Sequence, residues 1–184
     1  STEKEETKRN YSVAIDYSNE INEKTSIDFG YRYDNIHLGS DFKVNQIFGN
    51  SIEEISDFTN LVGYNESLHA GYVEMKINLE KESWTLGLRG ENTGIEVTAN
   101  KGGFEQKKNY FNVFPSLRYL RELSKKTRLQ VALYNRIQRP PRSTGWVLPY
   151  STFTDNRNLF VGNPDIDPSY ITGIEAELMM RPSK

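Results

Sequence analysis

Apolar and polar residues alternate along most of this chain, and this alternation predicts β-strands. In the first such segment, Tyr11, Val13, Ile15 and Tyr17 are separated by small or polar residues. Each predicted strand therefore has one apolar face and one face that carries charges of both signs. We expect seven strands of this kind, over residues 11–17, 26–34, 70–79, 84–91, 111–119, 128–138 and 170–180.

The connections between the predicted strands are alternately short and long. All long loops then lie at one end of the sheet, as in outer-membrane barrels with short periplasmic turns and long extracellular loops. The sequence thus predicts an all-β fold, an antiparallel meander of about seven strands that forms part of a large transmembrane β-barrel. We expect short turns at Asn19–Lys24, Glu80–Glu82 and Glu122–Lys126, and long loops at residues 39–65, 93–108 and 140–168.

Alternation by itself does not decide whether the apolar faces point to lipid or into a protein core. The aromatic residues favour lipid, because two bands of Tyr and Trp bracket an aliphatic middle, as in the aromatic girdles of barrels. Ordinary strand aromatics are the simpler alternative, since strands favour these residues anyway. The residues of the predicted girdles are Tyr17, Trp84 and Tyr119 beside the short turns and Tyr11, Tyr31 and Tyr33 towards the other end.

Composition excludes several classes of protein. The chain has 184 residues and a net charge of −2, which argues against a nucleic-acid partner. It has no cysteine and two histidines, so disulfides, thiolate sites and a histidine metal cluster are not expected. No apolar run reaches the roughly 20 residues of a membrane helix. The charged N-terminus does not resemble a signal peptide.

The predicted loops contain two local patterns. Ser51 with Glu54 forms a capping-box pattern, which predicts a short helix within Ser51–Leu61. Gly102-Gly103 predicts a flexible loop tip.

Three ordered motifs resemble the barrel domain of TonB-dependent outer-membrane receptors, especially the Bacteroidetes-type outer-membrane β-barrel family. They are Tyr110-Phe111-Asn112-Val113-Phe114-Pro115-Ser116-Leu117, Asn135-Arg136-Ile137-Gln138-Arg139-Pro140-Pro141 and Gly162-Asn163-Pro164-Asp165-Ile166-Asp167-Pro168-Ser169-Tyr170. The family commonly has Leu-Lys-Pro-Glu where this chain has Ile166-Asp167-Pro168-Ser169, so no charge-based role is carried over there.

The resemblance implies that residues 1–184 are part of a barrel of about 22 strands, without its plug domain or closing strand. It implies import of an iron chelate, vitamin, glycan or peptide across the outer membrane of a Gram-negative cell. The implied partners are outer-membrane lipid, the plug domain of the same parent chain, the TonB energy-coupling system and a surface lipoprotein. No cofactor and no nucleic acid is implied.

In the resembled family, the third long loop lies at the top of the barrel wall, where aromatic and arginine side chains can contact a solute. The residues that would do so here are Arg139, Arg142, Trp146, Tyr150 and Phe153. Aromatic faces suit sugars or planar ligands, and arginines suit carboxylates or phosphates. Packing within the loop is the structural alternative for most of them.

Charged residues on the polar strand faces are expected to line the lumen. No spacing among them singles out a catalytic pair, so we do not expect an enzyme. Two alternatives to a receptor remain, a passive outer-membrane barrel or adhesin and a soluble β-sandwich that binds carbohydrate. The expected lumen residues are Asp28, Arg32, Glu74, Lys76, Arg89, Glu91, Arg118, Arg136, Glu175 and Glu177.

Overall fold

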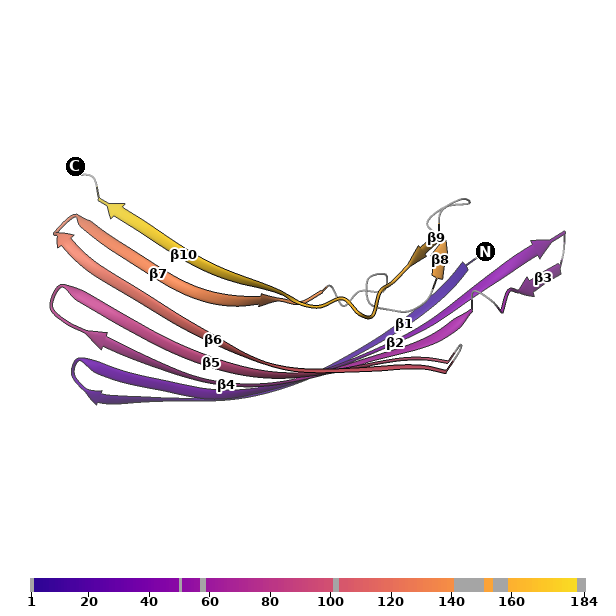
Figure 1. The fold of residues 1–184 in the computed structure, drawn as a ribbon, viewed down its shortest axis with the longest axis horizontal. Helices are drawn as coiled ribbons and strands as arrows, with labels where there is room; N and C mark the ends of the chain where they lie inside the picture. Colours follow the sequence, from indigo (N-terminus) through magenta and orange to yellow (C-terminus); the bar gives the residue numbers. More distant parts are fainter. Residues whose placement is uncertain are drawn as a thin grey trace.

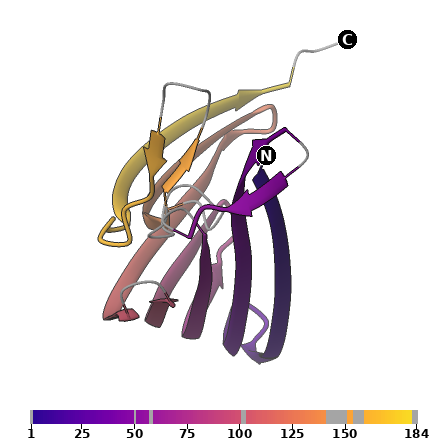
Figure 2. The same ribbon diagram turned by 90° about the vertical axis from the view of Figure 1, so that its right-hand side faces the viewer.

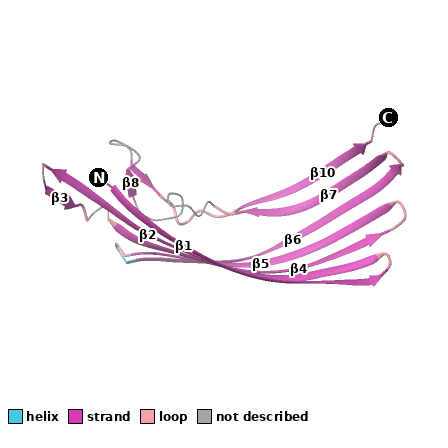
Figure 3. Ribbon diagram, turned by 180° about the vertical axis from the view of Figure 1, so that it is seen from behind, coloured by secondary structure: helices cyan, strands magenta, loops and turns pink. Residues whose placement is uncertain are grey.

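The computed structural model describes residues 2–49, 51–56, 59–100, 103–140, 151–153 and 159–181. Strands make up nearly all of this part of the chain (Figure 3). They form one antiparallel sheet in the order β1-β2-β4-β5-β6-β7-β10, with β3 paired to β2 and a separate β8-β9 hairpin. Their bounds are β1 Thr2–Asn22, β2 Thr25–Phe48, β3 Ser51–Glu54, β4 Asn60–Asn78, β5 Glu82–Ala99, β6 Phe104–Ser124, β7 Thr127–Gln138, β8 Ser151–Phe153, β9 Leu159–Val161 and β10 Ser169–Met180.

The antiparallel meander and the short turns at one end are confirmed. Figure 1 shows the β1-β2, β4-β5 and β6-β7 turns together at one end, with β3 and the β8-β9 hairpin at the other. Side-chain oxygens close two of these turns by accepting bonds from backbone amides two residues later. Asn22 Oδ1 accepts from the Lys24 amide at 2.9 Å, and Ser124 Oγ accepts from the Lys126 amide at 3.2 Å.

Two of the long connections are shorter than the predicted loops 39–65 and 93–108, because the strands continue into both predicted loops. β2 runs on to Phe48, β4 begins at Asn60, and β5 and β6 are paired up to Ala99 and Phe104. The predicted helix within Ser51–Leu61 is wrong. Residues Ser51–Glu54 form β3, with Ile52 directly opposite Ile47 of β2. Gly103 has a φ of 60°, and Gly102 lies outside the described residues.

The sheet curves, and residues 162–168, which lead into β10, lie on its concave side (Figure 2). We call this the inner face and the opposite side the outer face. The half of the strands near the short turns is the lower half, and the other is the upper half. In the lower half the outer face is apolar and exposed, with no second sheet against it among the described residues. This band includes Tyr11, Val13, Ile15, Tyr17, Phe29, Tyr31, Val73, Leu86, Leu88, Phe111, Val113, Leu133, Ile174, Leu178 and Met180.

The polarity of the two faces is inverted in the upper half. There the inner face carries the buried hydrophobic cluster of the molecule, and the outer face carries polar and charged side chains such as His37, Glu96 and Lys107. Successive side chains of a regular strand point to opposite faces. The inversion therefore means that the apolar residues of the sequence change from one set of alternate positions to the other. The cluster consists of Phe42, Val44, Val62, Tyr64, Val97 and Ala99, with Leu38, Ile55, Ile95 and Phe104 packed against it.

Two tyrosines on the inner face of the lower half lie over glycines of the neighbouring strand. Tyr72 covers Gly30 and donates to Asp16 Oδ1 at 2.7 Å. Tyr134 covers Gly173 and donates to Glu175 Oε1 at 2.7 Å. A Cβ at either glycine would overlap the tyrosine ring, so glycine here makes room for a flat-lying aromatic side chain.

We therefore expect Gly173→Ala to destabilise the sheet by about 1–3 kcal/mol, the usual cost of an overpacked contact. The matched control is Gly71→Ala, because the nearest atom to an added Cβ there is 4.0 Å away. The free energy of unfolding of the full-length protein in detergent, measured with urea, checks this. Equal values for both variants would contradict the role of the tyrosine.

Candidate functional site

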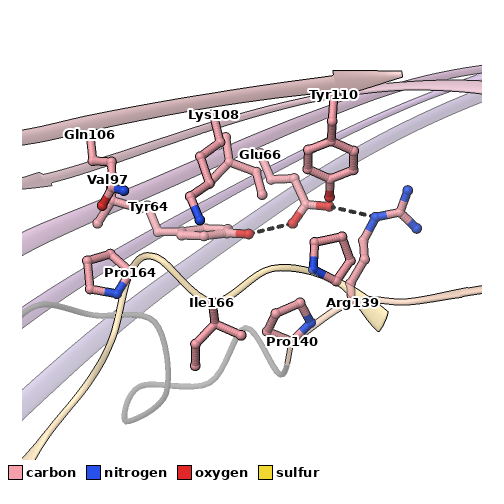
Figure 4. Close-up of a pocket in the computed structure, with 12 residues that line it drawn as sticks. Tyr64, Glu66, Val97, Gln106, Lys108, Tyr110, Arg139, Pro140, Pro164 and Ile166 are labelled. Atoms are coloured by element: carbon pink, nitrogen blue, oxygen red, sulfur yellow. Dashed lines mark hydrogen bonds and ion pairs between the residues drawn. The ribbon is translucent and has the colours of Figure 1, made fainter. Parts of the chain in front are cut away.

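The chain leaves β7 at Gln138, and of the connection to β10 the residues 139, 140 and 162–168 lie against the inner face of the upper half. We call these residues the crossing segment. Residues on both sides of this crossing line a small pocket (Figure 4). Tyr64, Val97 and Tyr110 belong to the wall of the sheet, and Pro164 and Ile166 belong to the crossing segment. The other lining residues are Glu66, Ile95, Gln106, Lys108, Arg139, Pro140 and Pro168.

A buried ion network holds the start of the crossing segment. Arg139 Nη2 is 2.5 Å from Glu91 Oε2 and donates to Thr93 Oγ1 at 3.2 Å. Its Nε lies 3.9 Å from Glu66 Oε1. Only 17% of the Arg139 side chain is exposed, and Glu91 and Glu66 are 7% and 2% exposed. Charges this deeply buried are tolerated because each has a partner.

Each carboxylate of this network has a further donor. Arg89 Nε bonds Glu91 Oε1 at 2.6 Å, and the Tyr64 hydroxyl donates to Glu66 Oε2 at 2.6 Å. Burial acts to lower the pKa of Arg139, but the hydrogen bond and the charge of Glu91 outweigh it and raise the pKa. The guanidinium therefore stays charged at any physiological pH.

Unsatisfied polar atoms gather at the same place. Among the described residues, four buried side-chain atoms have no hydrogen-bond partner, and three of them are Tyr110 OH, Asn112 Nδ2 and Arg139 Nε. The sheet register places Tyr110 opposite Thr93 and Asn112 opposite Glu91. Buried polar groups are normally paired. The inner wall around Glu91 thus offers donors to an oxygen-bearing group.

The end of the crossing segment is a compact turn that rests on β6. Asn163 Oδ1 accepts from the Asp165 amide at 2.9 Å, which closes the turn. Lys108 Nζ is 3.2 Å from Asp167 Oδ1 and 3.8 Å from Asp165 Oδ1, and Gln106 also donates to Asp165. Both aspartates are largely exposed, so each ion pair is worth about 0.2–1 kcal/mol.

Arg139 is the one predicted site residue whose side chain the structure describes, and it lies in the pocket wall. Arg142, Trp146 and Tyr150 lie outside the described residues. Phe153 is paired with Leu159 in the β8-β9 hairpin, and its side chain is not described. Ligand binding by these five residues stays a prediction.

Most residues on the wall side of this pocket were not predicted from the sequence. Tyr64 lay inside the predicted loop 39–65 and Lys108 inside the predicted loop 93–108. Glu66 stood in the gap before the next predicted strand. The signal that could have found them is alternation of the opposite sense, with the apolar residues on even positions of β4, as in Val62, Tyr64 and Leu68.

The sequence matches the model of the outer membrane protein beta-barrel family over residues 1–183. The chain belongs to this family. A structure described as "ferric citrate transporter FecA in the unliganded form" is similar in fold, with a TM-score of 0.60 and 16% sequence identity. The similarity covers 74% of this chain and 21% of that transporter, so the chain spans about a fifth of its length. No curated protein sequence matches the chain.

The family places the chain in the outer membrane of a Gram-negative cell, and the apolar band then faces lipid. On β6 this band runs from Phe111 to Tyr119, close to the 9–11 residues that a strand needs to cross a bilayer. Aromatic contacts mark its two ends. Trp84 and Tyr119 have ring centroids 4.3 Å apart near the short turns, and Tyr31 bonds His69 Nδ1 at 2.6 Å at the other end.

No helix among the described residues is long and apolar enough to cross a membrane. Within the same residues, no group of three or more His, Cys, Asp or Glu side chains is arranged to hold a metal ion.

A charge in the apolar band should be far more costly than a charge above it. We expect Leu88→Arg to reduce stability by about 2–4 kcal/mol, because Leu88 lies opposite Pro115, in the middle of the lipid-facing band. Thr98→Arg on the outer face of the upper half should cost about 1 kcal/mol or less. Urea unfolding of the full-length protein in lipid vesicles measures both. Similar losses for the two variants would contradict the assigned position of the membrane.

The ion network predicts a second contrast. We expect Arg139→Met to cost about 3 kcal/mol, the lower end of the range for a broken buried pair, because Glu91 keeps Arg89 as a partner. Arg128→Met removes the exposed pair with Glu122 and should cost about 1 kcal/mol or less. The same unfolding measurement compares them. A cost for Arg139→Met no larger than that of the control would show that the network does not hold the segment.

Proposed function

We propose that this chain is a segment of the barrel wall of a TonB-dependent outer-membrane receptor that imports a nutrient. The observation that carries the proposal is the crossing segment, which begins at Arg139 and folds onto the inner face above a lipid-facing band. A segment in this position narrows the mouth of a pore and can meet a solute that enters from outside. Family membership and the fold similarity to a transporter support it.

The described sheet supports the proposal that the barrel contains further strands. Its two edge strands, β1 and β10, do not pair with each other. Inside hydrocarbon every backbone amide and carbonyl needs a hydrogen-bond partner, so an open edge is not stable there. The partners that fit the proposal are the remaining strands and plug domain of the same protein, the TonB system, outer-membrane lipid and a surface lipoprotein.

Arg139, Arg142, Trp146, Tyr150 and Phe153 are the proposed solute contacts. Arg139 lies in the wall of the pocket, with its Nη2 bonded to Glu91 and its Nε 3.9 Å from Glu66 Oε1. The nutrient classes that fit are iron chelates, vitamins, glycans and peptides.

The test is accumulation of labelled members of these classes by cells that produce the full-length protein. We expect one class to accumulate and accumulation to stop when a protonophore collapses the proton-motive force. The variant Arg142→Ala, Trp146→Ala should bind that solute about tenfold more weakly or worse, as expected when a hot spot is truncated. Tyr11→Phe on the lipid face is the matched control. Entry that a protonophore does not change would instead indicate a passive barrel.

A further inference from the structure

Different kinds of contact hold the two ends of the crossing segment. At its base, Arg139 pairs with Glu91, and both side chains are at least four-fifths buried. Its tip is the turn 163–168, which leads into β10. There Lys108 pairs with Asp165 and Asp167, whose side chains are 73% and 85% exposed. Breaking a buried pair leaves an uncompensated charge, whereas exposed pairs exchange readily with ions from solution. The base therefore stays bound to the wall, whereas the tip can separate from Lys108.

From this contrast we infer that Lys108 and Gln106 form a carboxylate-binding site on the inner wall, which Asp165 and Asp167 of the same chain fill in the closed state. The two donors stand two positions apart on β6, so they share the inner face. An ammonium group and an amide side by side are suited to carboxylate oxygens. A solute with two or more carboxylates satisfies the same donors that the aspartates satisfy.

The tip also forms the roof of the pocket. Across the pocket from Tyr64, Val97 and Lys108 lie Pro164 and Ile166 (Figure 4). Pro168 also lines the pocket. In the closed state the remaining cavity is about 20 Å³, enough for about one water molecule. A solute is admitted only when this roof lifts.

The turn that forms the roof is built to move as a unit. Its internal bonds, from the Asp165 amide to Asn163 Oδ1 and from the Ile166 amide to the Asn163 carbonyl, do not involve the wall. Exchange of the aspartates for a solute carboxylate therefore frees residues 163–167, while Arg139 stays bonded to Glu91 and Ser169 stays paired with Gln138 at the start of β10. Val97, which is 2% exposed, then becomes accessible.

This inference deepens the proposed function, on which it rests for the route by which a solute reaches the lumen. Binding at Lys108 does not itself require transport. An assay of accessibility therefore separates failure of this site from failure of import, which is measured by uptake.

The experiment introduces Val97→Cys into the full-length protein, in a background without other thiols, and measures the rate of maleimide labelling in outer-membrane vesicles. The described chain contributes no thiol of its own. Propane-1,2,3-tricarboxylate is compared with sodium chloride at equal ionic strength. Thr98→Cys, one residue away on the exposed outer face, reports general access of the reagent. Ile95→Cys, also in the pocket wall, replaces Val97→Cys if that variant does not fold.

We expect the tricarboxylate, but not chloride, to speed labelling of Val97→Cys by roughly three- to tenfold, as expected for release of two exposed ion pairs. Adding Asp165→Asn and Asp167→Asn should give the faster rate without any added anion. Adding Lys108→Gln should also give the faster rate and remove the response to tricarboxylate. Labelling at Thr98→Cys should not change. Equal acceleration by both salts, or an unchanged rate in the aspartate variant, would overturn the site.

Discussion

Each long strand of this sheet passes from lipid into water, and its side chains change roles where it leaves the lipid. A strand of 21 residues such as β6 is about twice as long as a bilayer requires. In the lower half, lipid solvates the outer face and water hydrates the inner one. In the upper half water surrounds the outer face, so the apolar side chains lie on the inner face, where other parts of the protein cover them. The crossing segment is part of that cover, and the inversion of polarity is therefore the reason it lies on the wall.

The ion network stands at the level where the two halves meet. Glu91 is opposite Ala70 on β4 and Asn112 on β6, next to the upper end of the lipid-facing band. Arg139 reaches Glu91 as the chain leaves β7, so one buried pair connects the wall to the start of the crossing segment. Apolar packing alone would leave the segment free to slide. The buried arginine fixes the position of the segment, because any shift would leave its charge without a partner.

The sequence was sufficient to predict the lower half of the fold. Strict alternation in segments such as Tyr11–Tyr17 and Phe111–Tyr119 predicted strands, and polar turns such as Glu122–Lys126 marked where they end. The upper half was mistaken for loop because its alternation has the opposite sense. In 60–68, for example, the apolar residues Val62, Tyr64 and Leu68 fall on even positions, whereas Val73, Met75 and Ile77 fall on odd ones.

The candidate site was less predictable for a different physical reason. Arg139 was identified by its motif, and Glu91 was expected in the lumen, but nothing local in the sequence relates residues 48 positions apart. Their contact depends on the register of the sheet and on the path of a long connection. The helix expected at Ser51–Leu61 failed for a related reason. Its capping pattern is a local preference, and pairing of Ile52 with Ile47 in an extended hairpin prevailed over it.

The inner wall changes character along the axis of the strands, and this bears on how a solute would pass. Above the ion network the wall is apolar and aromatic and is covered by the crossing segment. Below it the wall is charged, with the half-buried Asp28 and Glu74 and the exposed Arg118. Asp28 lies directly opposite Glu74, so this part of the wall is acidic and hydrated, without the apolar cover of the upper half. Under the proposed function, the covered upper part of the wall would meet the solute first and the hydrated part would line its route, and the boundary between them lies at Glu91, next to the upper end of the lipid-facing band.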